Sequence, residues 1–438
     1  MGNVDFNIFR NMKKYFFLMF IAVSISIEAQ QVNYNYLPVK VNGKYGFINT
    51  EGNYIIKPDF DYLGYLVEGR ARVNVGGKPD DLGLIDGGKW TFIDSLGKPI
   101  KEPVYDMVND FSEGRALIQL GAFYGFIDKQ GNEVIPCKYS DVMDFHDGLA
   151  QFKENGRWGS MDKDGNIVIA PRFYNFYQFS EDRAAVGYIF NKGYINKLGN
   201  HITDTNFFDA KSFKGGLAVV VSVDSARYGM VDAFGTIVIP CKYGYINGFS
   251  EELSAVNIGG VFALDIYEVS GGSWGFIDKN NKLVIPAIYE NAGNFSEGLC
   301  PVKKKGKWGY IDKDNKTIIP FQFAACSPFS SGMARIIKSG KYGYIDKTGK
   351  IIIQPQFDDA NDFIYGLAIV NKGREFNEYS PELGKPGKCG VINKSGRFII
   401  PLEFDNIRQE GNNLFRVSKG NGWGYYNPTG VCIFPVTE

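Results

Sequence analysis

The sequence predicts an all-β protein that is built as one tandem array of short repeats. Gly is abundant, with 53 of 438 residues, and aromatic residues make up 15% of the chain; both are typical of a β protein with many turns. An aromatic-Gly pair followed by Asp or Asn recurs with a basic spacing of 34 residues. The segments between the turns are short and rich in β-branched and aromatic residues, without a helical stripe longer than one turn. This composition separates the chain from helical repeats of the same period.

The first 29 residues are predicted to be an export signal. Lys13 and Lys14 precede an apolar run from Tyr15 to Ile27, and Ala29 offers a small residue for cleavage. The run is too short to cross a bilayer of ~30 Å as a helix, so a cleaved signal is preferred to an anchor. Met12 is a possible true start. We expect residues 30–438 to form a single mature array that is secreted, periplasmic or on the cell surface, with no membrane span.

Eleven units are recognised from the aromatic-Gly pair and its degenerate copies. Three are degenerate, at Trp90-Thr91, Lys192-Gly193 and Cys389-Gly390. The pairs begin at Tyr45, Trp90, Tyr124, Trp158, Lys192, Tyr228, Trp274, Trp308, Tyr342, Cys389 and Trp423.

Each unit is predicted to begin with a strand that carries the pair and ends in a tight turn. All eleven units have Asp or Asn, two free positions and then Gly or Asn, as at Asp162 and Gly165. The Asx side chain accepts a hydrogen bond from the backbone two residues on, and the fourth position favours a residue that tolerates the left-handed conformation. This pattern predicts a type I turn with a Gly bulge that closes a hairpin.

Two further strands complete the predicted unit. The second strand carries a Pro such as Pro320, which cannot donate to a ladder and should therefore end this strand or mark its edge, and an aromatic such as Phe323 follows. We expect this repeated aromatic to be a wedge in the core. The third strand follows a Phe-Ser-Glu-Gly segment, as at Phe295 to Gly298, which predicts a second tight turn. The unit is therefore a meander of three short strands.

These residues resemble the bacterial WG-repeat (KWG-repeat) family, whose consensus combines K-W-G-Y-I-D-K, a Pro and an aromatic with a following F-S-E-G-L-A. Lys307 to Pro320 and Lys341 to Pro355 match it almost throughout. The resemblance covers roughly residues 33 to 436. It implies an array of uncertain role, often exported, and no separate catalytic domain accompanies the array here.

Two arrangements of the units fit the sequence. One unit has too few strand residues to bury its own apolar faces, so neighbouring units must stack. We expect an open or superhelical array, because eleven units exceed the four to eight blades usual in a propeller. Propeller-like closure is the alternative, because Leu37 to Val41 resembles a lone third strand and the chain stops after a second strand near Pro435.

Three long insertions are the candidate binding surface. They span Gly76 to Lys89, Gly259 to Ser273 and Gly373 to Lys388, always just before the aromatic-Gly pair. Equivalent positions in a stacked array lie on one rim, so the loops could form a shared surface. The alternative is that hairpin tips simply tolerate insertion. The predicted binding residues are Asp265, Tyr267, Glu268, Arg374, Glu378 and Tyr379.

No catalytic residue, metal site or cofactor is predicted. Only His146 and His201 are present, and neither has a nucleophile or zinc-binding context. The acidic turns superficially resemble the start of a calcium loop, but Phe173 occupies the place of the bidentate Glu that such a loop needs. We expect the six cysteines to be reduced, with Cys300 to Cys326 the least implausible bridge. The balance of 48 basic and 48 acidic residues argues against nucleic acid as a partner.

The favoured function is an exported, non-enzymatic binding or scaffold protein. Its array would present a repeat surface to a protein or glycan of the cell envelope, since exposed Tyr and Trp rings can stack on sugars or peptides. One alternative is an envelope hydrolase with a carboxylate site on the loop rim. A purely structural spacer is the other.

Overall fold

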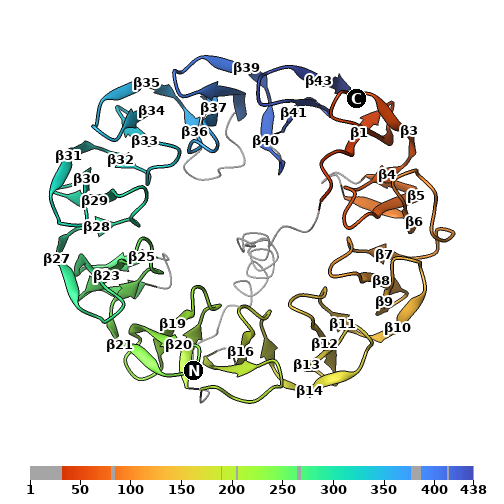
Figure 1. The fold of residues 1–438 in the computed structure, drawn as a ribbon, viewed down its shortest axis with the longest axis horizontal. Helices are drawn as coiled ribbons and strands as arrows, with labels where there is room; N and C mark the ends of the chain where they lie inside the picture. Colours follow the sequence, from red (N-terminus) through yellow and green to blue (C-terminus); the bar gives the residue numbers. More distant parts are fainter. Residues whose placement is uncertain are drawn as a thin grey trace, which may run out of the picture.

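In a computed structural model of the protein, the chain forms a closed ring of small antiparallel sheets, here called blades (Figure 1). The structure describes residues 32–79, 84–188, 190–203, 206–263, 268–375, 386–411 and 414–437. The predicted all-β class and the tandem repeats are confirmed, because the elements in these ranges are strands and no α-helix is among them. The predicted export signal, residues 1–29, lies outside the described residues.

Eleven blades follow one another along the chain. Blades 1 to 4 comprise β1 (Leu37–Val41), β2 (Lys44–Ile48) and β3 (Tyr54–Phe60); β4 (Tyr62–Leu63), β5 (Ala71–Pro79) and β6 (Ile85–Ile93); β7 (Met107–Val108), β8 (Ala116–Leu120), β9 (Phe123–Ile127) and β10 (Glu133–Tyr139); and β11 (Asp141–Val142), β12 (Ala150–Glu154), β13 (Arg157–Met161) and β14 (Ile167–Phe173). Blades 5 to 7 comprise β15 (Asn175–Phe176), β16 (Arg183–Tyr188) and β17 (Asn191–Asn196); β18 (Phe207–Ala210), β19 (Leu217–Ser222), β20 (Tyr228–Asp232) and β21 (Ile237–Tyr243); and β22 (Tyr245–Ile246), β23 (Ser254–Ile258), β24 (Val261–Ala263), β25 (Glu268–Ser270), β26 (Ser273–Ile277) and β27 (Leu283–Tyr289). Blades 8 to 11 comprise β28 (Asn291–Ala292), β29 (Cys300–Lys304), β30 (Lys307–Ile311) and β31 (Thr317–Phe323); β32 (Ala325–Cys326), β33 (Met333–Lys338), β34 (Lys341–Asp346) and β35 (Ile351–Phe357); β36 (Asp359–Ala360), β37 (Leu367–Arg374), β38 (Pro386–Asn393) and β39 (Phe398–Phe404); and β40 (Asn406–Gln409), β41 (Phe415–Lys419), β42 (Gly422–Tyr426) and β43 (Cys432–Thr437).

A regular blade has four strands, ordered from the inside of the ring outward, as in blade 4 with β11, β12, β13 and β14 (Figure 1). The three predicted strands are the second, third and outer strands. The inner strand of two residues was not predicted, because it follows the core aromatic without a turn signal of its own. A sequence unit supplies the third and outer strands of one blade and the second strand of the next. Each repeat therefore joins two blades.

The Gly of the aromatic-Gly pair is required by close backbone packing. A Cβ on Gly309 would lie 2.6 Å from the carbonyl oxygen of Ile319, because the outer strand bulges across this point. Blade 2 has Thr91 at the equivalent position, and there the outer strand is reduced to isolated bridges at Tyr105 and Pro99. The Thr91 hydroxyl donates to the carbonyl oxygen of Lys101 instead. Blade 5 keeps Gly193 at this position and also has an irregular outer edge, with an isolated bridge between Ile195 and His201.

Both predicted turns are present. In the Asx turn of blade 4, Asp162 Oδ1 accepts hydrogen bonds from the backbone of Asp164 and Asn166, and Gly165 has a φ of +82°. The Glu-Gly turn is a two-residue hairpin in which both residues have positive φ, as at Glu113 and Gly114. Both turns lie at the same end of the strands. The turns between second and third strands lie at the other end, which we call the tip face of the ring.

The repeated aromatic is a wedge between blades, as predicted. Phe323 is 1% exposed and packs in one cluster with Phe329 and Ile336 of the next blade. Phe329 also contacts Tyr310 of the preceding blade, with ring centroids 4.9 Å apart. Burial of these rings makes each blade depend on its neighbour, so the core runs around the whole ring.

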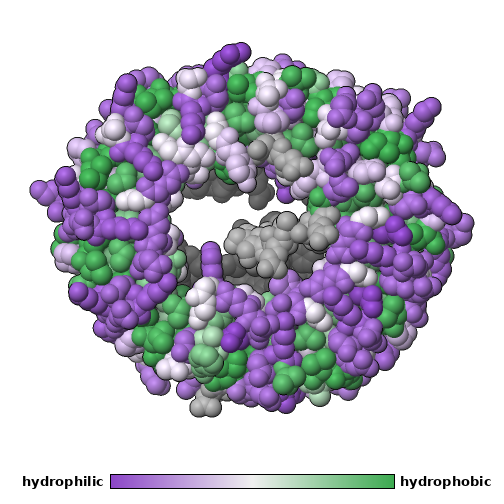
Figure 2. Space-filling model, in the orientation of Figure 1, coloured by the Kyte–Doolittle hydropathy of each residue, from purple (hydrophilic) through white to green (hydrophobic). Residues whose placement is uncertain are grey.

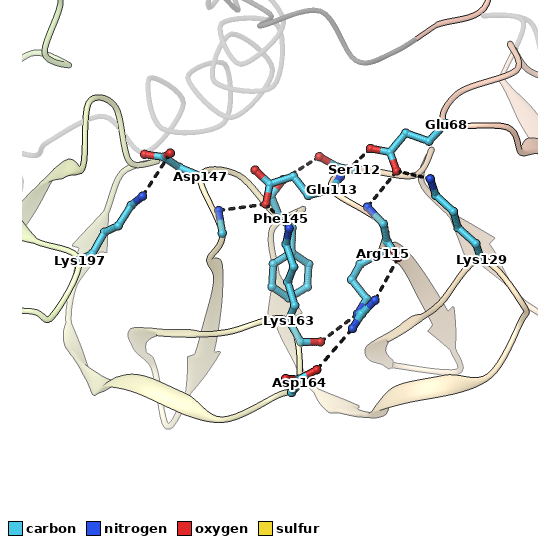
Figure 3. A network of polar contacts seen from close by, with 12 residues as sticks. Glu68, Ser112, Glu113, Arg115, Lys129, Phe145, Asp147, Lys163, Asp164 and Lys197 are labelled. Carbon is cyan, nitrogen blue, oxygen red and sulfur yellow. Dashed lines mark hydrogen bonds and ion pairs between the residues drawn. The ribbon is translucent and has the colours of Figure 1, made fainter.

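Polar contacts repeat around the ring beside this core. Glu68 accepts hydrogen bonds from the backbone of Glu113 at 2.8 Å and Gly114 at 2.9 Å, and pairs with Lys129 at 3.0 Å (Figure 3). Glu113 repeats this contact one blade on, with the backbone of Gly148 and with Lys163. A carboxylate from one tight turn therefore holds the next turn. Because Glu68 and Glu113 adopt positive φ, their hydrogen bonds offset part of the strain of that conformation.

On the tip face, a Lys-Asp pair links neighbouring blades. Lys388 lies 2.5 Å from Asp405 Oδ1, and the backbone of Gly420 donates to Asp405 Oδ2 at 2.7 Å. These two hydrogen bonds hold the pKa of Asp405 below its usual value. Equivalent pairs are Lys44–Asp61, Lys89–Asp106 and Lys341–Asp358. Blade 5 has a similar pair one residue further along each strand, between Lys192 and Asp209.

The open or superhelical array is not the arrangement found; the propeller-like alternative is. Blade 11 packs on blade 1 in one apolar cluster that contains Leu37, Val39, Tyr425 and Phe434. An open array would leave these faces in water, whereas closure buries both. Eleven blades were expected to be too many for a propeller. They form one ring because they surround a wide central opening, which Figure 2 shows. A ring of greater circumference accommodates more blades.

Candidate ligand-binding site

The junction between blade 11 and blade 1, here called the seam, differs from the other junctions. The other ten blades each have an inner strand, whereas β1 lies at the edge of its three-stranded sheet. The carbonyl groups on this edge are satisfied by side chains of blade 11. Tyr425 donates its hydroxyl to the carbonyl oxygen of Pro38 at 3.0 Å, and Thr437 donates to that of Lys40 at 2.5 Å. No inner strand covers β1 in the part of the chain that the structure describes, and these two hydroxyl groups bond to its free edge instead.

A pocket of about 290 Å³ lies at the seam. It is formed by strands from both ends of the chain, because β1, β2 and β4 face β40, β41 and β42. We call it the seam pocket. The residues that line it are Pro38, Tyr45, Tyr62, Leu63, Gly64, Tyr65, Asn406, Arg408, Arg416, Val417, Ser418, Gly420, Asn421, Gly422 and Trp423.

Aromatic rings form one wall of the seam pocket. Trp423 of blade 11 lies 6.3 Å from Tyr45 of blade 1, and Tyr45 lies 5.4 Å from Tyr62 of blade 2, between ring centroids. Burial raises the pKa of the Tyr45 hydroxyl, and the neighbouring Tyr62 adds to the effect. Tyr45 therefore stays neutral at physiological pH and can donate a hydrogen bond. Rings with one apolar face and a polar edge suit a ligand that is both flat and hydroxylated.

Arg416, which also lines the seam pocket, is held in place by contacts with its neighbours. Its guanidinium lies 5.2 Å from the Trp423 ring, and its Nε is 3.3 Å from Glu410 Oε1. Tyr65 donates its hydroxyl to Glu410. Burial, followed by the charge of Glu410, raises the pKa of Tyr65. These contacts span blades 11 and 2, so the site exists only when the ring is closed.

Nine segments of the sequence match the family model for the WG containing repeat. They are residues 45–78, 90–122, 124–158, 158–187, 228–262, 274–308, 308–342, 342–375 and 390–423, more than half of the chain. The chain belongs to the WG-repeat family. The match confirms the resemblance and omits the stretch between residues 187 and 228, which contains the degenerate pair at Lys192.

Comparison of this WG-repeat protein with curated proteins finds no match. Solved structures of similar form share little sequence with it. A crystal structure of the eukaryotic initiation factor is 10% identical with a TM-score of 0.42, covering 85% of this chain and 97% of that chain. The extracellular domain of a putative hybrid two-component system from B. thetaiotaomicron is 9% identical with a TM-score of 0.23, covering 93% and 71%. Kluyveromyces lactis Hsv2 is 10% identical with a TM-score of 0.26, covering 61% and 91%. Likeness at this level says nothing about function.

Of the predicted binding residues of the WG-repeat protein, the structure describes Arg374 and the backbone of Glu268, which belong to blades 10 and 7. Arg374 lies at the end of β37 and pairs with Asp359 at 2.6 Å. The backbone of Glu268 belongs to β25, which pairs with β24. Asp265, Tyr267, Glu378 and Tyr379 lie outside the described residues. The insertions extend hairpins on the tip face, as the repeat register predicted, but they belong to blades 2, 7 and 10, which are spread around the ring (Figure 1).

The seam pocket was missed by sequence reasoning. Its residues come from 38–65 and 406–423, and only ring closure brings these segments together. One signal was available, since Leu37 to Val41 precedes the first unit and resembles a lone strand.

Three further observations describe the structured ranges. No helix there is long and apolar enough to cross a bilayer. No three His, Cys, Asp or Glu side chains in those ranges come together in a group that could hold a metal ion. All six cysteines are free thiols.

Proposed function

We propose that this WG-repeat protein is a non-enzymatic glycan-binding protein of the cell envelope and that the seam pocket holds its ligand. The observation that carries the proposal is the aromatic wall of Trp423, Tyr45 and Tyr62 along a pocket at the junction of the first and last blades. The volume, about 290 Å³, is at the lower end of the range for small-molecule sites. It suits one or two sugar rings better than a protein surface.

The composition of the pocket favours binding over hydrolysis. Glycoside hydrolysis usually requires two carboxyl groups on either side of the scissile bond. The residues that line the seam pocket include no Asp or Glu, and Glu410 behind them is engaged by Arg416 and Tyr65. A purely structural spacer gives no reason for a pocket whose rings and arginines come from three blades.

Ligand screening with matched variants tests this proposal. The exported protein is screened against a panel of saccharides and peptides by thermal shift and calorimetry, and products are analysed after long incubation. We expect a saccharide to bind wild type and Trp308→Ala, and to bind Trp423→Ala at least tenfold more weakly. Trp308 is the control because it occupies the equivalent position in blade 8. Equal binding to all three proteins would place the site elsewhere, and chemical conversion of the sugar would contradict the non-enzymatic role.

Export is tested separately. The amino terminus of the protein recovered from the envelope or medium is expected at Gln30. A terminus before Gln30 would contradict the proposed cleavage site, and recovery only from the cytoplasm would contradict the compartment.

A further inference from the structure

Two arginines face each other inside the seam pocket. Arg408 on β40 and Arg416 on β41 are directly opposed in the antiparallel register, and both line the pocket. Directly opposed residues project on the same face of a sheet, and like charges in this relation destabilise it. A negative charge placed between the two guanidinium groups would remove that repulsion.

The charges around the two arginines are unequal. Arg416 forms an ion pair with Glu410 at 3.3 Å. For Arg408, by contrast, no acidic side chain in the described ranges lies within ion-pairing distance. Since the pocket lining itself has no carboxylate, the site carries one unmatched positive charge, and Arg408 is exposed to solvent there.

The neighbours of Arg408 suit a sugar rather than a bare anion. Asn406 and Asn421 add amide groups that donate and accept hydrogen bonds, and Trp423 and Tyr45 add flat ring faces. An inorganic anion would contact the guanidinium groups but would make no use of the ring faces and amide groups. A saccharide with a carboxylate would use all three kinds of group.

We propose that the seam pocket recognises a carboxylated saccharide and that Arg408 binds its carboxylate. This inference rests on the glycan-binding function proposed above and adds the charge of the ligand. A planar guanidinium forms two parallel hydrogen bonds with a carboxylate, a geometry that gives specificity as well as affinity. The single unmatched charge corresponds to one carboxylate, whereas a phosphate ester carries about −1.5 to −2. The sugar acid is either free or the end residue of a glycan chain.

Glucuronate and glucose are the probes, because they differ only at the carboxylate carbon. We expect the exported protein to bind glucuronate at least tenfold more tightly than glucose in calorimetry at low ionic strength. Arg408→Gln is expected to remove that preference, because glucuronate then binds no more tightly than glucose does. Arg397→Gln, an exposed arginine on the Asx turn of blade 10, is the matched control and keeps the preference. Salt should weaken glucuronate binding and spare glucose binding.

The outcomes separate the two proposals. Equal affinity for both sugars, or a preference that survives in Arg408→Gln, would overturn the carboxylate assignment while leaving glycan binding intact. Tighter binding of glucose 6-phosphate than glucuronate, or of acetate as tightly as glucuronate, would also overturn it. If Trp423→Ala bound the saccharides as tightly as wild type, the seam pocket would not be the binding site. A disaccharide with a terminal glucuronate distinguishes the sources, since tighter binding than free glucuronate indicates a chain end.

Discussion

Tyr425 in the last blade donates its hydroxyl to the carbonyl oxygen of Pro38 in the first blade at 3.0 Å. In blades 8 and 9 the equivalent Tyr310 and Tyr344 donate to the inner segment of the next blade, at Ser327 and Asn361. At the seam the same hydroxyl bonds to the edge of β1, where the described residues form no inner strand. One side-chain position thus serves both the ordinary junctions and the closure of the ring.

Removal of this hydroxyl should weaken the ring. Tyr425→Phe would leave the carbonyl of Pro38 without its donor in a buried place, which costs about 1–3 kcal/mol. Urea unfolding monitored by tryptophan fluorescence measures the loss. Tyr344→Phe serves as the comparison, since it removes the same bond inside the array, and it should cost a similar amount. An unchanged midpoint for Tyr425→Phe would mean that the seam bond contributes nothing.

The Gly of the aromatic-Gly pair should be far less replaceable than a Gly of the hairpin tip. Gly309→Ala places a Cβ 2.6 Å from the carbonyl oxygen of Ile319 and should cost about 3 kcal/mol or more. Gly306→Ala in the same blade meets open space at a φ of +72°, so it should cost only about 1–2 kcal/mol. Thermal and urea unfolding of both variants checks the order. If Gly306→Ala were the more damaging change, close backbone approach would not explain why the aromatic-Gly pair recurs from unit to unit.

Stability should depend on pH through Asp144, whose Oδ2 accepts a hydrogen bond from Asn109 at 2.9 Å. Burial raises the pKa of Asp144 to about 6. The folded state then holds the proton more tightly than the unfolded state, so this group disfavours folding progressively as pH rises from about 4 to 6. Asp144→Asn should therefore raise the free energy of unfolding by roughly 1–3 kcal/mol at pH 7.5 and change it little at pH 4.

Urea unfolding of Asp144→Asn at both pH values gives the comparison. Asp224→Asn is the control, because Asp224 is exposed and should show no such difference. Equal effects of Asp144→Asn at pH 4 and pH 7.5 would show that proton binding by Asp144 is not involved.

Without ligand, the opposed arginines of the seam pocket should reduce stability. Arg408→Gln removes one of two like charges on neighbouring strands and should stabilise the free protein by about 0.2–1 kcal/mol. The gain should shrink in high salt, because both groups reach solvent. Differential scanning calorimetry at low and high NaCl measures it. A loss of stability in Arg408→Gln would show that Arg408 has a partner within the fold.

The thiols should react in a defined order. Cys432 is exposed, whereas Cys300 and Cys389 are buried. Burial raises the pKa of Cys137 to about 11 and of Cys326 to about 12, so little reactive thiolate forms at pH 8. We expect one fast thiol in the native protein, absent in Cys432→Ser, and six in the denatured protein. Fewer than six would reveal a disulfide.

Much of the fold was predictable from local pattern. The Asx turns, the Glu-Gly turns, the Pro-containing strand and the wedge aromatic follow from residues close in sequence, and each recurs in the structure at the predicted place. The degenerate pair at Trp90-Thr91 lies in a blade whose outer strand pairs only through isolated bridges. The inner strands of two residues escaped prediction, because two residues carry no periodicity.

The candidate site was not predictable in the same way. The insertions that contain Arg374 and Glu268 were predicted as a binding surface because they interrupt the repeat. In the structure they extend separate hairpins around the ring. The residues of the seam pocket do not interrupt the repeat in the sequence. Apart from Arg408 and Tyr65, they occupy ordinary positions of the repeat.

The sequence by itself determined the repeated blade, because turns, strands and wedges depend on contacts within one unit and its neighbour. Only the tertiary structure decided between an open array and a ring. That choice depends on the small rotation from each blade to the next, summed over eleven blades, and no single unit encodes the sum. Closure brings Trp423 of the last blade beside Tyr45 of the first blade. The pocket is a consequence of that meeting of the two ends.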